Sequence, residues 1–235
     1  MKYLRKFDSV QGLNNAVASS KIDFLGLAYN NGTPMLKKAV DTRLVCVYNV
    51  VSTQEPTQLL NMPDYFTSME VDGIELAEVV SDYTFSTTGL HTVKLTFDGT
   101  TIGEAAFYSC TGLKSVTIPN GVTDTGVATF GGCSGLTSVI LPNSVTTIDD
   151  ECFADCSGLT SITIPNSVEV IGSWAFSVSG LTTVISLPTT PPHYGTEAFK
   201  PSNISSIYVP AGSVDAYKAA QGWSNYASSI QAIQS

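Results

Sequence analysis

Five phenylalanines recur along the chain at a fixed interval, and their sequence numbers are 23 apart. They are Phe107, Phe130, Phe153, Phe176 and Phe199. Three other residue types keep a constant offset from these rings, with glycine four residues before, cysteine three after and proline twelve after: Gly103, Gly126, Gly172 and Gly195; Cys110, Cys133 and Cys156; Pro119, Pro142, Pro165 and Pro188. A fixed period of this size is typical of stacked repeats, each of which buries its side chains against its neighbours. The spacing therefore predicts a mainly β solenoid of 23-residue repeats.

Each repeat contains two segments that read as extended backbone. The first runs from a leucine to a proline, as in residues 113–119, and its apolar residues Val116 and Ile118 are two apart, as on one face of a strand. Proline cannot donate the next ladder hydrogen bond, and the Asn-Gly or Asn-Ser that follows it supplies a turn. The second segment, such as residues 145–148, leads to the glycine and then to the phenylalanine. This pattern predicts two walls of short parallel strands with the aromatic rings between them.

The repeat resembles that of the BspA-like leucine-rich repeat family, which reads roughly Ile-Gly-x-x-Ala-Phe-x-x-Cys-x-x-Leu-x-x-Ile-x-Ile-Pro-x-Ser-Val-Thr. Residues 148–170 are the best copy, and the resemblance covers about residues 86–235. Three positions depart from it, where Thr125 replaces Ile, Asp149 replaces Gly and Ser179 replaces Cys. The resemblance implies a leucine-rich-repeat solenoid of the kind that gut Bacteroides or their phages display, with adhesion or recognition of proteins and host components. It carries over no set of functional residues.

Four parts can be distinguished along the chain. Residues 1–42 predict a small α+β module, with a strand near residues 3–7, a helix capped at Asp8 or Ser9, and a hairpin that turns at Asn30-Asn31-Gly32. The other parts are a β subdomain, the repeats and a C-terminal cap that includes a helix near residues 213–220; their ranges are 43–97, 98–210 and 211–235.

The β subdomain alternates apolar and polar residues with a period of two, and Asp72-Gly73 marks a tight hairpin. Its last stretch, residues 83–95, resembles the closing strand of an immunoglobulin-like module. Because Leu90 precedes Leu113 by one full repeat interval, the same stretch also reads as a further coil that covers the open end of the solenoid.

The charge of the chain is divided unevenly. Residues 1–43 hold seven of the eleven Lys and Arg residues and three Asp, which leaves a net +4 there and −13 in the remainder. An acidic repeat region argues against nucleic acid as a partner, because phosphate binding needs clustered cations. We read the basic start as a candidate attachment element, or as the solvated surface of a small module.

Residue types that carry chemistry are scarce. The chain has two histidines, His91 and His193, and they are far apart in the sequence. The sequence therefore predicts no metal site, no cofactor and no Cys-His catalytic pair. The five cysteines are best explained as buried structural thiols. Residues 1–20 include Arg5, Lys6 and Asp8 where a secretory signal has an uninterrupted apolar core, so no signal peptide is expected there, and no apolar run is long enough for a transmembrane segment.

The outward side of the repeat strands is the candidate partner-binding face. It consists of two columns of mostly hydroxyl-bearing residues: Thr92, Ser115, Ser138, Ser161, Thr183 and Ser206, and Lys94, Thr117, Ile140, Thr163 and Tyr208. Small polar residues also occur on stacked sheets simply because they fit there. The leading hypothesis is a non-enzymatic recognition or adhesion protein, on a bacterial or viral surface, for a protein or surface-glycan partner. The alternative is a structural component of a phage virion or injection-type particle, attached through residues 1–42.

Overall fold

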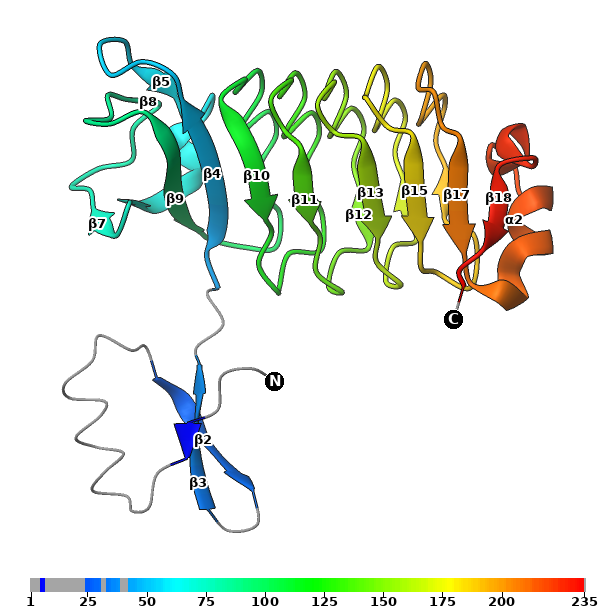
Figure 1. Cartoon of the computed structure of the whole chain (residues 1–235), viewed down its shortest axis with the longest axis horizontal. Helices are drawn as coiled ribbons and strands as arrows, with labels where there is room; N and C mark the ends of the chain where they lie inside the picture. The colour runs from blue at the N-terminus through cyan, green and yellow to red at the C-terminus, as the bar shows by residue number, and fades with distance from the viewer. Residues whose placement is uncertain (1–4, 7–23, 31–32, 39–41, 235) are drawn as a thin grey trace. The chain divides into compact units, whose positions relative to one another are not determined.

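The computed structural model describes residues 5–6, 24–30, 33–38 and 42–234, and the chain divides into two compact units, Met1–Thr42 and Arg43–Ser235 (Figure 1). The described part is mainly β, as predicted. In the first unit an antiparallel sheet has the order β1-β3-β2, with β1 (Arg5–Lys6), β2 (Phe24–Asn30) and β3 (Thr33–Lys38). Asn30 pairs with Thr33, which confirms the predicted hairpin. The predicted helix that begins at Asp8 or Ser9 lies outside the described residues.

The second unit begins with antiparallel strands. These are β4 (Leu44–Val50), β6 (Phe66–Val71), β7 (Ile74–Glu75) and β9 (Gly89–Phe97), with a small separate pair, β5 (Thr57–Gln58) and β8 (Asp82–Tyr83), and a 3-10 helix, η1 (Pro63–Tyr65). The hairpin at Asp72-Gly73 is confirmed, because Val71 pairs with Ile74. Its two turn residues have φ of +49° and +86°, which suits the type I′ turn that an Asp-Gly pair favours.

The remaining strands stack in parallel and form two walls (Figure 1). The first wall contains β10 (Leu113–Thr117), β11 (Ser138–Ile140), β13 (Ser161–Ile164), β15 (Thr183–Ser186) and β17 (Ser206–Val209). The second wall contains β12 (Thr147–Ile148), β14 (Val170–Ile171) and β16 (His193–Tyr194). Paired residues lie 23 apart, as in Ser115 with Ser138 and Thr147 with Val170, except for an offset of 22 between Ser161 and Thr183.

Between the two walls lies the phenylalanine ladder. All five rings are completely buried, as predicted, and neighbouring rings stack with centroids 5.1–5.4 Å apart. The ladder ends against aromatic side chains on both sides, since Phe107 contacts Phe66 and Phe199 contacts Trp223, each at a centroid distance of 5.7 Å. The core of the second unit is therefore continuous from the β subdomain to the C-terminal segment.

At the N-terminal end of the stack, the hypothesis that residues 83–95 form a further coil is wrong. β9 is not next to β10, because β4 lies between them and is antiparallel to both. Leu90 is 71% exposed, whereas Leu113, its counterpart in the next repeat, is buried. An antiparallel strand thus covers this end of the stack and continues its sheet into the β subdomain.

The C-terminal segment covers the other end. It contains α2 (Val214–Ala219), within the range predicted for a helix, and the 3-10 helices η2 (Ala211–Ser213) and η3 (Trp223–Tyr226). β18 (Ile230–Ala232) then pairs in parallel with β17, and Ile207 lies opposite Ile230. Trp223 is fully buried and donates its indole N–H to Pro192 O at 2.9 Å. Among the described residues no helix is long and apolar enough to cross a membrane.

Candidate partner-binding surface

All eleven residues predicted for the partner-binding face lie on strands. Thr92 and Lys94 are on β9, Ser115 and Thr117 on β10, Ser138 and Ile140 on β11, Ser161 and Thr163 on β13, Thr183 on β15, and Ser206 and Tyr208 on β17. The strand register aligns Ser115 with Ser138, and Thr183 with both Ser161 and Ser206. We refer to this set, with the three residues added in the next paragraph, as the strand face.

Sequence reasoning missed three members of the strand face. Val45 and Val47 of β4 stand between the predicted residues of β9 and those of β10, because Val47 pairs with both Thr92 and Ser115. Ile185 pairs with Thr163 and with Tyr208. Because paired residues of β13 and β15 are 22 and not 23 apart, the member of this column on β15 is one residue earlier than the repeat interval predicts. The alternation in residues 44–50, whose even-numbered members are buried, would have identified the two valines as outward-facing. The face is therefore a hydroxyl column beside a mixed aliphatic and hydroxyl column.

The hydrogen-bonded ladder is interrupted within the strand face. Among the described strands, one sheet ends with β11 and the next begins with β13, and no pairing joins the two. The coils stay in contact there through other segments, since Phe130 N donates to Cys152 O at 2.9 Å and the rings of Phe130 and Phe153 stack at 5.4 Å. Ile140, at the end of the first sheet, is 57% exposed and is the most exposed large apolar residue of the face.

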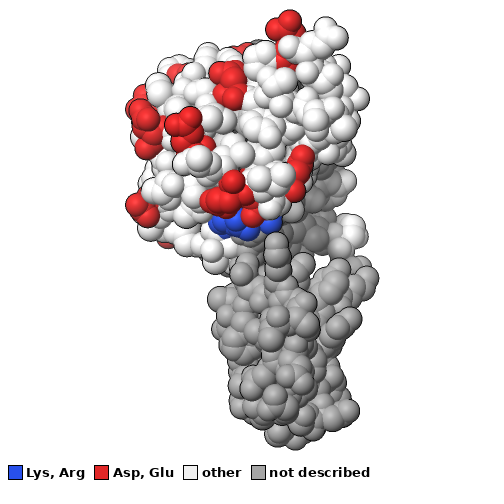
Figure 2. Space-filling view, turned by 90° about the vertical axis from the view of Figure 1, so that its left-hand side faces the viewer, with Lys and Arg blue, Asp and Glu red and all other residues white. Residues whose placement is uncertain are grey.

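Charge on the strand face is confined to one end. Lys94 lies 3.3 Å and Arg43 2.9 Å from carboxylate oxygens of Glu70. Partial burial opposes ionisation of Glu70, but the hydrogen bonds from Arg43 and Lys94 outweigh it and lower the pKa of this carboxyl. Figure 2 shows the adjoining end of the second unit, where Asp and Glu are scattered over the surface and Lys and Arg appear in one place. The rest of the strand face is uncharged.

Hydrogen bonds of Asp72 hold the hairpin next to the strand face. Asp72 accepts a hydrogen bond from the backbone N–H of Thr92 at 2.9 Å, and its other oxygen lies 2.6 Å from Nδ1 of His91. Burial disfavours the Asp72 carboxylate, yet the His91 contact and the Thr92 N–H outweigh this effect and lower the pKa. These contacts join the start of the face to the Asp72-Gly73 turn.

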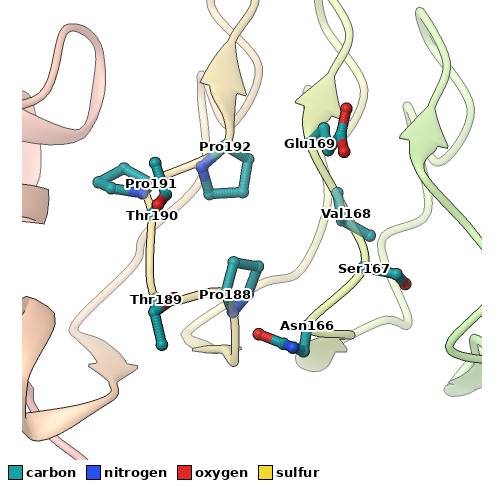
Figure 3. A pocket seen from close by; sticks show the side chains of 9 residues that line it. All are labelled: Asn166, Ser167, Val168, Glu169, Pro188, Thr189, Thr190, Pro191 and Pro192. Atoms are coloured by element: carbon teal, nitrogen blue, oxygen red, sulfur yellow. The ribbon is translucent and has the colours of Figure 1, made fainter.

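A groove of about 480 Å³ separates two turns of the stack (Figure 3). One side consists of residues 166–169, whose N–H groups at Val168 and Glu169 donate to Pro165 O at 3.1 Å and to Thr146 O at 2.8 Å. The equivalent positions in the next repeat are Pro191 and Pro192, which have no N–H to donate. Pro191 therefore cannot close its own turn as Val168 does, and Pro192 cannot bond to the preceding coil as Glu169 does, whereas His193 N still donates to Glu169 O at 2.8 Å. The groove lies where these two bonds are missing.

The far side of the groove is fixed by the C-terminal segment. Pro188 O accepts a hydrogen bond from the Tyr217 hydroxyl at 2.9 Å, and Thr189 O accepts one from Ser213 Oγ at 2.7 Å. Figure 3 shows Asn166 pointing toward Pro188 across the gap. Glu169 is the only charged residue in the lining. The groove is thus a small recess between two turns, beyond the ends of the first-wall strands.

Two of the departures from the repeat pattern compensate for each other. Thr125 and Asp149 occupy adjacent coils, where Asp149 N donates to Thr125 Oγ1 at 2.9 Å and the Asp149 carboxylate accepts the N–H of Gly126 at 2.7 Å. Burial, together with the neighbouring Asp124 and Asp150, raises the pKa of the Asp149 carboxyl. A hydroxyl and a carboxylate have replaced an apolar side chain and a glycine, and their bonds tie the two coils together.

The cysteines are structural in this arrangement. All five are buried free thiols, as predicted, and Cys133 Sγ and Cys156 Sγ donate to Phe107 O and Phe130 O of the preceding coil at 3.0 and 3.2 Å. Burial raises the pKa of every one of these thiols, which keeps them protonated and unreactive. Within the part of the chain that the structure describes, no three His, Cys, Asp or Glu side chains form a group that could hold a metal ion.

The chain was compared with solved structures and with curated proteins. A leucine-rich repeat protein of T. pallidum is 33% identical, with a TM-score of 0.46, over 50% of this chain and 56% of that one. A leucine-rich cell surface protein of Faecalibacterium prausnitzii A2-165 is 29% identical, with a TM-score of 0.37, over 48% of this chain and 39% of that one. The chain thus spans about half or less of these proteins. The comparison with curated proteins gives no match.

A family model described as the BspA type leucine-rich repeat region matches residues 78–205 in six copies. The match covers more than half of the 235 residues and includes the whole phenylalanine ladder. The model describes a repeat region and not a catalytic domain. By this match, and with the resemblance in the repeat itself, the chain belongs to the BspA-type leucine-rich repeat family.

Proposed function

We propose that the chain is a non-enzymatic recognition protein that binds a protein or surface-glycan partner through the strand face. In this proposal residues 98–210 are a solenoid of 23-residue repeats, residues 43–97 are a cap with an immunoglobulin-like closing strand, and residues 211–235 are the second cap. Family membership supports display on a bacterial surface, where adhesion to host components is the corresponding role. The observation that carries the proposal is the strand face, which is uncharged except at Lys94 and extends over two adjoining sheets.

The composition of the strand face suits recognition. Its hydroxyl column offers donors and acceptors without the desolvation cost of charges, and its aliphatic members, such as Ile140 and Ile185, offer apolar area beside them. Solenoids commonly use such extended surfaces for binding, because the stacked coils hold the exposed side chains in fixed positions.

The test introduces large uncharged side chains on the strand face, where they should block access of a partner. Ser138 and Ser161 are exposed on β11 and β13, and tyrosine is favoured in strands, so Ser138→Tyr with Ser161→Tyr should leave the fold intact. The full chain and the variant are titrated by biolayer interferometry against a panel of purified host extracellular proteins and surface glycans. We expect binding to at least one of them, weakened about tenfold or more in the variant, which corresponds to about 1.4 kcal/mol.

The matched control is Asn143→Tyr with Asn166→Tyr. These exposed residues occupy equivalent positions in two neighbouring turns, and Asn166 lines the groove. We expect this pair to bind like the unmodified chain. Loss of binding in the control and not in the strand-face variant would move recognition to the groove, and absence of binding to the whole panel would count against adhesion.

The second candidate function is a structural component of a phage virion or injection-type particle, attached through residues 1–42. Two observations favour it: the contacts separate Met1–Thr42 from the rest of the chain, and this unit belongs to the basic part of an otherwise acidic sequence. Opposite charges promote association of such surfaces.

Deletion of residues 1–42 tests this candidate. We expect the full chain to self-associate in sedimentation velocity experiments in a salt-dependent manner, and the deletion variant to be monomeric while it keeps a cooperative thermal transition. A full chain that is monomeric, or a deletion variant that no longer folds, would remove the case for a dedicated attachment module. In the latter case residues 1–42 would be part of the fold.

A further inference from the structure

Trp174 is an exposed tryptophan in the segment between β14 and β15. The chain has two tryptophans; Trp223 is completely buried, whereas 43% of Trp174 is accessible to solvent. Its neighbour in the same coil, Val178, is 49% exposed. Tryptophan is the residue most enriched at the energetic centres of protein interfaces, so its position on the surface calls for an explanation.

Trp174 occupies a position with an unusual backbone. In every coil the residue two before the phenylalanine has φ between +52° and +57°; these residues are Ala105, Ala128, Glu151, Trp174 and Glu197. Left-handed backbone costs a residue with a side chain of order 1–3 kcal/mol. Val178 also has a φ of +54°, which is especially unfavourable for a β-branched residue. Alanine suffices at the same position in two other coils, so the fold does not need a large side chain there.

Hydrogen bonds fix the neighbours of Trp174. Glu151 N donates to Ser173 O and Trp174 N donates to Thr196 O, both at 2.9 Å. Because these bonds join adjacent coils in register, Glu151 and Glu197 flank Trp174 on either side in the same column. Both glutamates are exposed.

The charge around this column is mostly negative. Residues 115–199 contain seven Asp and Glu and no Lys or Arg. The next cation along the chain is Lys200, which lines the same recess as Glu197 and, among the described residues, forms no ion pair. A cation above the indole would therefore meet an attractive aromatic face and carboxylates on both sides.

We propose that Trp174, with Glu151 and Glu197, binds an arginine or lysine side chain of a partner protein. The indole face attracts the cation through its quadrupole, which strengthens binding at an exposed site, and the flanking carboxylates add charge complementarity. Val178 extends the apolar surface within the same coil. The inference goes beyond the proposed function, since it concerns a different surface and does not depend on which partner the strand face binds.

The probe for this site is a short arginine peptide with blocked termini. A matched peptide contains citrulline, which has the shape of arginine without its charge. The two indole N–H signals of the full chain are followed by two-dimensional NMR, and Trp174→Ala identifies which signal belongs to which tryptophan. We expect the Trp174 signal to shift with millimolar affinity for the arginine peptide, the Trp223 signal to stay in place, and the citrulline peptide to have little effect.

Two pairs of substitutions separate this site from general attraction to an acidic protein. Glu151→Gln with Glu197→Gln removes two charges beside the indole and should weaken binding about threefold or more. Asp64→Asn with Glu78→Gln removes two exposed charges in the β subdomain and should have little effect at about 0.15 M salt, where charges beyond about 8 Å are screened.

Three results would overturn the proposal: a Trp174 signal that does not move, equal shifts with the citrulline peptide, or equal weakening by both pairs. Ser138→Tyr with Ser161→Tyr should leave the arginine titration unchanged. Failure at Trp174 is therefore distinguishable from failure of the strand face.

Discussion

Phe153→Ala is expected to lower the free energy of unfolding by about 3–5 kcal/mol, because the substitution leaves a cavity that the surrounding core fills only in part. Phe153 is the middle ring of the ladder, and its centroid lies 5.4 Å from those of both Phe130 and Phe176. Removing it also eliminates two stacked contacts, which are worth about 0.5–1.5 kcal/mol each beyond their buried area. The measurement is equilibrium urea denaturation followed by far-ultraviolet circular dichroism.

The control for this prediction is Trp174→Ala, which truncates an aromatic residue two positions before the next ring of the ladder. Because the Trp174 side chain is exposed and alanine occupies the same backbone position in two other coils, its effect should be within about 0.5 kcal/mol. A loss of less than about 1 kcal/mol for Phe153→Ala would contradict the role of the ladder as the central core.

The local repeat pattern was predictable because one residue type performs the same task in every coil. The phenylalanines fill the space between the walls, the prolines follow the first-wall strands, and Asp72-Gly73 forms the expected turn. These features depend only on the residue and its near neighbours in sequence or one period away.

The strand order at the start of the stack was not predictable in the same way. Alternation in residues 44–50 indicates a strand, but it does not indicate that β4 inserts between β9 and β10. Pairing partners far apart in sequence are chosen by the packing of whole elements, and the coincidence of Leu90 with the repeat spacing pointed to the wrong strand. Val45 and Val47 were missed from the strand face for this reason.

Two further features of the stack could have been predicted from the sequence spacing but were missed. Ile230 follows Ile207 by one full repeat interval, and this spacing corresponds to the parallel pairing of β18 with β17. A second glycine ladder directly precedes the regularly spaced leucines of the stack; it consists of Gly112, Gly135, Gly158 and Gly180. The glycines that the sequence analysis noted lie near the rings, whereas a Cβ atom at Gly135, Gly158 or Gly180 of this second ladder would meet backbone carbonyl oxygens of the preceding coil.

Gly135→Ala is expected to destabilise the chain by about 3 kcal/mol or more, at or above the upper end of the usual cost of overpacking. A Cβ atom at Gly135 would lie 2.1 Å from Thr111 O and 3.2 Å from Leu113 O, both on the preceding coil. These are backbone atoms, so no side-chain rotation relieves the clash, and the two coils must separate. Equivalent contacts recur one and two coils later, where a Cβ at Gly158 or Gly180 would lie 2.7 or 2.2 Å from a serine carbonyl oxygen.

Gly212→Ala is the matched control for this substitution. Gly212 has no atom within 4 Å of an added Cβ, and neither it nor Gly135 has a positive φ, so both replacements place alanine on ordinary backbone. The control should be neutral or slightly stabilising, by up to about 1 kcal/mol, because alanine reduces the conformational entropy of the unfolded chain. The difference between the two variants in urea denaturation therefore isolates the close approach of the coils. Equal stability of Gly135→Ala and Gly212→Ala would mean that the coils can move apart at little cost, and the stack would then be held by its rings and not by the contact between its turns.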